Sequence, residues 1–289
     1  MKGKVCVITG SGSGIGLETA TALSNMGAKV IIVTRNIEKS RQTIDKIRSI
    51  TGNDSLEGYG IDLSSQKSIG DGCREILKAN PVIDVLVNNA GTWFSKLTFT
   101  EENIETVFAV NYLAYFLVTH LLLPSLVKSD DPRIINVSSD SHFQAKMHFN
   151  DINLTSKYHG LRSYAQSKLA DVLFTYEFER RKPSGKLSVY CVQPGLVKTN
   201  IGLKNTVSLH GIAWKIRRMA GVQPADGATT SVFLASSEEA KNQSGKYWDK
   251  CKPKKSSKAS YNKEDARLLW DLSEKLCDIK NYFKADSQF

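Results

Sequence analysis

The sequence lacks the cysteine patterns that stabilise small secreted domains or hold zinc. Its 289 residues include five cysteines, an odd number, at widely spaced positions: Cys6, Cys73, Cys191, Cys251 and Cys277. None of them forms a C-x-x-C pair, so the sequence predicts neither a disulfide framework nor a metal site. Free thiols of this kind are typical of a reducing compartment.

Long apolar segments are also scarce. The most apolar run, Ala114–Val127, is shorter than the ~20 residues that span a bilayer and contains His120 and Pro124. We interpret it as a buried core helix. At the amino terminus, residues 1–4 lead directly into the apolar run 5–9 rather than into a signal-peptide segment. We therefore expect a cytoplasmic protein, with peripheral membrane contact as the alternative.

Acidic residues are fewer than basic ones: 29 Asp and Glu against 39 Lys and Arg, a formal net charge of +10. Such an excess attracts anions, including phosphorylated cofactors, acidic membranes and nucleic acid, although a solvated lysine-rich surface has the same composition. Five of the lysines crowd around Pro253, within 250–258. No aromatic platform or groove-reading motif accompanies them, so we expect no nucleic-acid partner.

Short apolar runs alternate along the chain with segments whose apolar residues recur every three or four positions. The runs are 5–9, 29–34, 56–62, 83–89, 133–138, 187–192 and 245–248, and the helical segments are 15–27, 36–51, 66–79, 101–128 and 162–182. This alternation is typical of a parallel sheet covered on both faces. The sequence shows no repeat or linker, so it predicts one α/β domain over 1–289, with a doubly wound, seven-stranded parallel sheet.

Three stretches interrupt the alternation. Residues 140–161 and 198–224 follow predicted strands, and a basic turn over 249–263 leads into a C-terminal helical extension, 260–280. In a doubly wound sheet, ligands bind outside the carboxyl ends of the strands. We therefore expect 140–161 and 198–224 to be substrate loops.

A glycine-rich turn joins the first predicted strand to the first helix, with the sequence Thr9-Gly10-Ser11-Gly12-Ser13-Gly14-Ile15-Gly16. Glycine allows the tight turn and lets the backbone approach a pyrophosphate. The helix that begins here offers free N–H groups and the positive end of its dipole to phosphates. A strand before the turn and a helix after it favour dinucleotide binding over a purely structural turn.

The second strand indicates which dinucleotide is bound. Enzymes that prefer NAD carry an acidic residue near its end to receive the ribose hydroxyls, whereas this chain reads Val33-Thr34-Arg35-Asn36. The guanidinium of Arg35 suits a 2′-phosphate. The sequence therefore favours NADP(H), the alternative being that Arg35 is a plain surface residue.

Tyr164 and Lys168 lie four positions apart in a predicted helix and so share one face of it. A phenol titrates near about pH 10 on its own, but a nearby ammonium and an oxidised nicotinamide favour the phenolate. Proton exchange near neutral pH then becomes feasible. Ser138 and Ser139 end the fifth strand, where a hydroxyl can hold the substrate oxygen. By itself, the spacing of Tyr164 and Lys168 also fits a surface tyrosine beside a lysine.

In combination, these motifs resemble the short-chain dehydrogenase/reductase superfamily. They are Thr-Gly-x-x-x-Gly-Ile-Gly at 9–16, Asn-Asn-Ala-Gly at 88–91, Asn111, Ser-Ser at 138–139, Tyr-x-x-x-Lys at 164–168 and Pro194-Gly195. The resemblance implies a three-layer Rossmann fold and a catalytic tetrad of Asn111, Ser139, Tyr164 and Lys168. Tyr164 is then the general acid/base, Lys168 binds the nicotinamide ribose, Ser139 holds the substrate oxygen, and Asn111 anchors a water.

The same resemblance assigns the dinucleotide contacts. Those expected are Gly10, Ser11, Ser13, Gly14, Ile15, Gly16, Arg35, Asp62, Leu63, Asn89, Ala90, Gly91, Tyr164, Lys168, Pro194, Gly195, Val197 and Thr199. The choice of Ser139 over Ser138 rests on this resemblance.

The chain is most similar to the retinol-dehydrogenase-like branch of the superfamily. Ser139 lies 25 positions before Tyr164, where many members have about a dozen, and this branch carries such an insertion. Further similarities lie at 140–142, 167–170, 244–248 and 268–277. We therefore expect an NADP(H)-dependent carbonyl reductase or alcohol dehydrogenase acting on a hydrophobic aldehyde, ketone or alcohol.

Several expectations about partners stay open at this point. Trp93, Phe94, parts of 140–151 and 196–219 are expected to form the substrate wall, and 209–219 has the pattern of a basic amphipathic helix. Superfamily members often form homodimers through the two long helices, here 101–128 and 162–182. The rival hypothesis keeps the fold and cofactor but makes the protein a catalytically weak dinucleotide sensor or scaffold.

Overall fold

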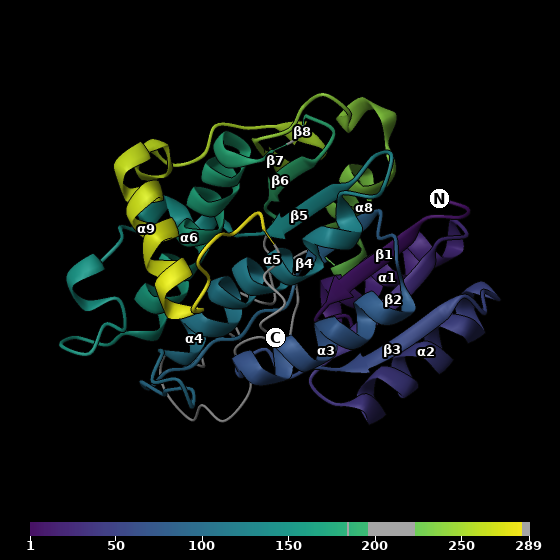
Figure 1. Ribbon diagram of the computed structural model, residues 1–289, viewed down its shortest axis with the longest axis horizontal. Helices are drawn as coiled ribbons and strands as arrows, with labels where there is room; N and C mark the ends of the chain where they lie inside the picture. Colours follow the sequence, from purple (N-terminus) through teal and green to yellow (C-terminus); the bar gives the residue numbers. More distant parts are fainter. Residues whose placement is uncertain (184, 196–222, 285–289) are drawn as a thin grey trace.

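The computed structural model describes residues 1–183, 185–195 and 223–284, in which strands and helices alternate from the amino terminus (Figure 1). The strands are β1 (Val5–Thr9), β2 (Lys29–Thr34), β3 (Leu56–Gly60), β4 (Val85–Asn88), β5 (Arg133–Val137), β6 (Ser188–Val192), β7 (Lys246–Asp249) and β8 (Lys252–Pro253). The α-helices are α1 (Gly14–Asn25), α2 (Ile37–Thr51), α3 (Gln66–Ala79), α4 (Thr106–Phe108), α5 (Ala114–Leu126), α6 (Gly160–Arg181), α8 (Pro224–Ser236) and α9 (Lys263–Leu276).

All eight strands form one sheet in the order β3-β2-β1-β4-β5-β6-β7-β8. The order reverses direction between β1 and β4, which is the point where doubly wound folds bind their ligands. Helices α1, α2 and α8 pack on one face of the sheet, and α3, α5 and α6 on the other (Figure 1). The three-layer Rossmann architecture predicted from the sequence is confirmed.

The strand count differs from the prediction of seven parallel strands. β1 to β7 are parallel, but β8 lies antiparallel to β7, within the stretch predicted as a basic turn. Lys250 and Cys251 connect the two strands with φ values of 49° and 58°. Two successive residues with positive φ form a tight turn whose twist matches that of the two strands of a hairpin. The chain therefore folds back after β7 instead of continuing as a loop.

The predicted helix 101–128 is interrupted near its start. Glu105 accepts hydrogen bonds from the backbone N–H groups of Val107 and Phe108 and thereby begins α4. A π-helical turn, Ala109–Leu113, then leads into α5. The continuous helical stretch Thr106–Leu126 has 21 residues and is long and apolar enough to cross a membrane, which corrects the length estimate from the sequence. However, 83% of its apolar window is buried, so the interpretation as a core helix is confirmed.

The C-terminal extension packs against α6 and α5 rather than projecting from the domain (Figure 1). Asn262 caps α9 by accepting from the backbone of Glu264 and Asp265, so the helix begins later than residue 260, and it ends at Leu276. Every residue of α5 is buried or half-buried, and so is every residue of α6 between 163 and 179. Much of the surface on which a homodimer was expected is therefore covered within the chain, although Val127 and Arg180 at the ends of these helices are exposed.

Of the two expected substrate loops, the structure describes the first fully and the second only in small part. Residues 140–161 contain two 3₁₀ helices, Asp140–Gln144 and Phe149–Asp151, so this stretch is partly ordered by its own short-range hydrogen bonds. Most of 198–224 lies outside the described residues, as does the expected amphipathic segment 209–219.

Candidate active site

The glycine-rich turn lies at the carboxyl end of β1, directly beside the end of β4. Gly10 has a φ of +67°, and a Cβ at this position would stand 2.6 Å from the Cα of Ala90. Only glycine therefore allows the two chain segments to approach so closely. Ser11 is fully buried and anchors the turn to β2, because its backbone N–H and its hydroxyl both donate to the carbonyl of Val33.

Asn89 joins the end of β4 to the same turn. Its backbone N–H donates to the Thr9 hydroxyl at 2.9 Å, and its side-chain Nδ2 donates to the Thr9 carbonyl at 2.8 Å. A Cβ on Gly16 would stand 2.4 Å from that Nδ2 and 2.5 Å from the Gly10 carbonyl oxygen. The predicted contacts Gly10, Gly16, Asn89 and Ala90 are thus brought together by the structure.

The first turn of α1 fits a pyrophosphate. Ser13 is exposed and precedes the helix with extended backbone, and its side chain makes no capping hydrogen bond. The first N–H groups of a helix have no partner within the helix, and here Gly14 and Ile15 are half-buried. This helix terminus therefore presents donors and the positive dipole end to an anion.

Two cations flank the turn, of which the sequence argument identified one. Arg35 follows β2 directly and is exposed. Lys39, on the first turn of α2, was missed; a Cβ on Gly12 would stand 3.2 Å from its Cγ, so its aliphatic chain lies across the glycine-rich turn. The sequence carries no specific signal for Lys39, because Arg35 precedes α2 and the two residues do not share a helix face.

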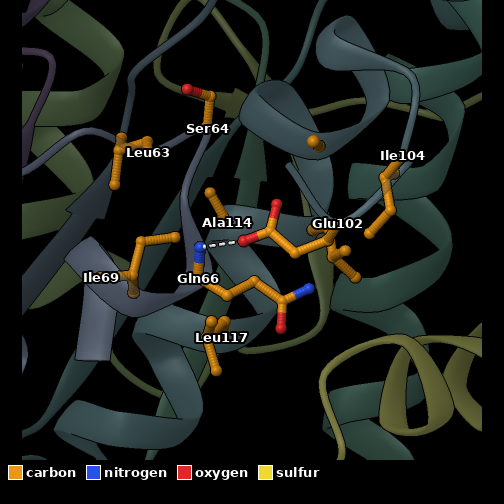
Figure 2. Close-up of a pocket in the computed structure, with 10 residues that line it drawn as sticks. Leu63, Ser64, Gln66, Ile69, Glu102, Ile104, Ala114 and Leu117 are labelled. Carbon is orange, nitrogen blue, oxygen red and sulfur yellow. Dashed lines mark hydrogen bonds between the residues drawn. The ribbon is translucent and has the colours of Figure 1, made fainter. Parts of the chain in front are cut away.

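Asp62 and Leu63 follow β3 as expected, with different surroundings. One carboxylate oxygen of Asp62 accepts from the backbone and the hydroxyl of Ser64, which fixes the turn. Leu63 lines a pocket between α3 and α5, in which Glu102 accepts from the Gln66 backbone N–H at 2.7 Å (Figure 2). The pocket wall is otherwise mainly apolar, with side chains such as Ile69, Ile104, Ala114 and Leu117 (Figure 2).

Asn111 lies in the π-helical turn and is fully buried. Its Oδ1 accepts from the Thr92 backbone N–H at 2.7 Å, and its Nδ2 donates to the Thr92 carbonyl and to the Ser167 hydroxyl, both at 3.1 Å. Ser167 in turn donates to the Tyr164 carbonyl at 2.8 Å. One hydrogen-bonded chain therefore connects the segment after β4 to the helix that carries Tyr164. A π-turn inside an α-helix frequently marks a functional site.

The two serines after β5 have different roles. Ser138 is buried and donates to the Lys168 carbonyl at 2.7 Å, which ties β5 to α6. Ser139 is half-buried, and its hydroxyl takes part in a turn with Ser141. Because Ser138 is already used in packing, the geometry favours Ser139 as the residue that meets a substrate.

His142 positions the backbone of Ser139. The two make a contact of 2.7 Å between Nδ1 and the Ser139 carbonyl oxygen, while Nε2 accepts from the Ser257 backbone N–H at 3.0 Å. Nε2 must therefore be unprotonated, so Nδ1 carries the proton and donates. Burial lowers the pKa of His142, which keeps the ring neutral. This contact links the serine to the basic segment near the C-terminus and was not foreseen from the sequence.

Tyr164 and Lys168 lie on α6 as predicted. Tyr164 is half-buried, and the Lys168 ammonium lies 5.9 Å from the centre of its ring. Lys168 is 3% exposed and donates to the Val137 carbonyl at 2.8 Å and to Asp171 at 2.9 Å. The ammonium thus lies between the end of β5 and the phenol ring of Tyr164.

Glu105 is a further buried carboxylate near the site that sequence reasoning missed. Besides capping α4, it accepts from Ser163 at 2.8 Å and from Tyr158 at 3.2 Å, and thereby holds the first turn of α6. Burial raises its pKa, although these hydrogen bonds act in the opposite direction.

The remaining expected contacts are only partly described. Gly91 is half-buried after β4, and beyond β6 Pro194 is half-buried and Gly195 is exposed with a φ of +79°. Val197 and Thr199 lie outside the described residues. Of the two aromatic residues expected in the substrate wall after β4, Trp93 is buried and packs against Gly160 at the start of α6, and Phe94 is half-buried.

Solved structures of similar shape bear on the fold. An uncharacterized protein from Mycobacterium paratuberculosis matches with a TM-score of 0.76 and 27% identity, covering 96% of this chain and 94% of that chain. A short-chain dehydrogenase from Shigella flexneri, solved in complex with NADP, matches with a TM-score of 0.68 and 23% identity, covering 87% and 98% respectively. The second likeness shows the shared fold alone.

Sequence comparison identifies the family. A family model described as short chain dehydrogenase matches residues 4–207. The chain is 35% identical to retinol dehydrogenase 14 of Mus musculus, covering 96% of this chain and 87% of that protein. It is also 35% identical to retinol dehydrogenase 13 of Homo sapiens, covering 96% and 86% respectively. The chain therefore belongs to the short-chain dehydrogenase family, in its retinol-dehydrogenase-like branch, and is an NAD(P)-dependent oxidoreductase acting on CH–OH groups.

Proposed function

We propose that the protein interconverts a hydrophobic aldehyde or ketone and the corresponding alcohol, with NADP(H) as its cofactor and Tyr164 as general acid/base. The observation that carries this proposal is the convergence of Asn111, Tyr164, Lys168 and the end of β5 on one edge of the sheet. The hydrogen-bonded chain from Asn111 through Ser167 reaches Tyr164, and Lys168 bridges to Val137. The nicotinamide supplies the hydride chemistry when the dinucleotide is bound.

The residues present fit a phosphorylated dinucleotide. The uncapped first turn of α1 offers N–H donors, and the close approach of Gly10 to Ala90 leaves no side chain between the turn and β4. Arg35 and Lys39 place two cations on the β2 side of the turn, where a 2′-phosphate would lie.

In this mechanism the side chains of the tetrad have distinct tasks. Ser139 holds the substrate oxygen, and Tyr164 gives that oxygen a proton in carbonyl reduction or removes it in alcohol oxidation. Lys168 stabilises the phenolate and binds the nicotinamide ribose. Asn111 fixes Thr92 and the backbone of α6, and anchors the water through which the proton reaches solvent.

Hydride transfer to a panel of substrates tests the function. We expect NADPH oxidation, followed at 340 nm, with at least one hydrophobic member of a panel of aliphatic, aromatic and retinoid aldehydes and ketones. Retinal belongs in the panel because relatives carry the name retinol dehydrogenase. Tight NADPH binding without turnover on any carbonyl or alcohol would instead support the sensor or scaffold hypothesis.

The cofactor preference is tested separately at Arg35. The Arg35→Ser variant is expected to raise the KM for NADPH by roughly 10- to 100-fold, since a charge-assisted hydrogen bond contributes ~1.5–3 kcal/mol. The KM for NADH, which has no 2′-phosphate, is expected to change little. Arg41→Ser, at an exposed arginine of α2, is the matched control. Equal loss of affinity for both nucleotides would contradict the assignment.

A further inference from the structure

A carboxylate with no part in the mechanism above lies against the catalytic lysine. Asp171 follows Lys168 by three residues on α6, and its Oδ2 lies 2.9 Å from the Lys168 ammonium nitrogen. Its exposed fraction is 0%, and that of Lys168 is 3%. An ion pair buried this completely costs desolvation energy that a hydrophobic pair would not, so its presence beside the reacting groups calls for a functional reason.

The hydrogen-bond partners of Lys168 hold its ammonium group in place. An ammonium group has three N–H donors, of which one bonds the Val137 carbonyl and one bonds Asp171. The ammonium also lies 5.2 Å from the centre of the Tyr115 ring. Asp171 therefore helps to fix the position of the lysine and of its positive charge beside the Tyr164 ring.

The other carboxylate oxygen of Asp171 is not compensated in the same way. Among the residues that the structure describes, its Oδ1 is buried and has no hydrogen-bond partner. The titratable groups around the carboxylate are Tyr112 of the π-helical turn, Tyr115 of α5 and Cys191 of β6. Burial raises the pKa of each. They stay neutral near pH 7, so Lys168 is the countercharge.

We propose that Asp171 is a positioning residue for Lys168, and that its negative charge sets how strongly the lysine favours the phenolate of Tyr164. The inference rests on the proposed function, because it requires Tyr164 to be the proton-transfer group. When Asp171 is ionised, the pair has no net charge and the attraction on a phenolate is weak. When Asp171 is neutral, the full charge of Lys168 acts on the ring 5.9 Å away.

The titration of Asp171 makes this balance sensitive to pH. Burial raises its pKa to about 7, against the attraction of Lys168. Burial lowers the pKa of Lys168, but the Asp171 carboxylate, together with the side chains of Tyr115 and Tyr164, raises it above the ordinary value. As the pH falls through about 7, Asp171 therefore takes up a proton while Lys168 keeps its charge. The pair then becomes cationic as the pH falls.

Asp171→Asn tests the role of the charge, since the amide oxygen still accepts from Lys168. We expect the variant to keep turnover, and the acidic limb of its pH profile for kcat/KM in alcohol oxidation to move to lower pH by at least ~0.5 unit. The matched control is Asp71→Asn, which removes a carboxylate from the exposed Lys67–Asp71 pair of α3 and is expected to leave the profile in place. Should Asp171→Asn not fold, Asp171→Ser removes the same charge with less volume.

The melting temperature of the nucleotide-free protein gives a second readout, independent of turnover. Between the ordinary value of 3.8 and about 7, folded Asp171 holds a proton that the unfolded chain releases, so this group lowers wild-type stability as the pH rises. The melting temperature of the asparagine variant relative to wild type is therefore expected to increase from pH 5 to pH 8. A constant difference would overturn the inference.

The kinetic outcomes separate this inference from the proposed function. If wild type and Tyr164→Phe turn over equally well, the proposed function fails, and the role of Asp171 fails with it. If turnover requires Tyr164 but the folded asparagine variant has the wild-type profile, or has no turnover at any pH, only the inference about Asp171 is overturned.

Discussion

Replacing Tyr164 with phenylalanine is expected to lower kcat by about 10²- to 10⁴-fold, the range that general acid–base catalysis contributes. The change removes one hydroxyl and leaves the ring, which the structure places 5.9 Å from the Lys168 ammonium. The backbone of Tyr164, which Ser167 holds, is unaffected by the substitution. NADPH affinity, measured by fluorescence titration, is therefore expected to stay within about threefold of wild type.

The control for this experiment lies on the same helix. Tyr176→Phe deletes a hydroxyl that bonds Ser256 at 2.7 Å, away from Lys168, and is expected to cost about 1 kcal/mol of stability. Its kcat should remain close to that of wild type. If both variants lost turnover equally, the effect would reflect damage to α6, and a Tyr164→Phe enzyme with full turnover would rule out the phenol as the acid/base.

The site residues that could be predicted are those that short sequence motifs identify. Gly10 and Gly16 are required by a turn of a few residues, and Tyr164 and Lys168 share a helix face because they are four positions apart. Strand–helix alternation then predicts that the glycine-rich turn and the Tyr164–Lys168 pair lie at the carboxyl edge of one sheet, and Lys168 does contact the Val137 carbonyl at the end of β5. The fold and the family could therefore be derived before any distance was known.

Other features of the site depend on contacts between distant segments. The choice of Ser139 over Ser138 rested on the family resemblance, and its physical reason is the hydrogen bond from Ser138 to Lys168, 30 positions away. His142 reaches Ser257, 115 positions along the chain. Asp171 lies in an apolar stretch of α6. It is buried because β6 and the π-helical segment pack against that helix, so its position beside Lys168 in the interior depends on distant segments. No local pattern carries that information.

Helix and strand ends show the same limit. Glu105 starts α4 because its carboxylate accepts two backbone N–H groups, and an apolar periodicity extending back to residue 101 does not register such a cap. Likewise, β8 exists because two residues adopt positive φ at Lys250 and Cys251, neither of which is glycine. The sequence signal for such a turn is normally asparagine or glycine.

Replacing Trp270 with alanine is expected to destabilise the protein by about 3–5 kcal/mol, the usual cost of removing a buried aromatic side chain. Trp270 is 2% exposed and joins α9 to the two long helices. Its ring lies 5.2 Å from Phe116 of α5 and 5.9 Å from Phe174 of α6, and the Arg181 guanidinium stacks 4.8 Å above it. Urea unfolding measures the loss.

The same ring secures the chain segment after α9. Tyr282 lies 4.6 Å from Trp270, donates to the Phe116 carbonyl at 2.7 Å, and has its own carbonyl 2.7 Å from His120 Nδ1. Together, α9 and this segment cover the apolar faces of α5 and α6. We therefore expect wild type to be monomeric, at the chain mass of 32.0 kDa, and light scattering after size exclusion measures this directly.

Weakening the packing of α9 on α5 and α6 should change the oligomeric state. With alanine at 270, the aromatic side chains of α5 and α6 become partly exposed, and a contiguous apolar patch of this kind favours self-association. The variant is thus expected to show a mass that rises with protein concentration. Leu268→Ala, at a 40% exposed position of α9, is the matched control and should change neither stability nor mass measurably. A wild-type dimer that dissociates in Trp270→Ala would mean instead that α9 itself forms the subunit interface.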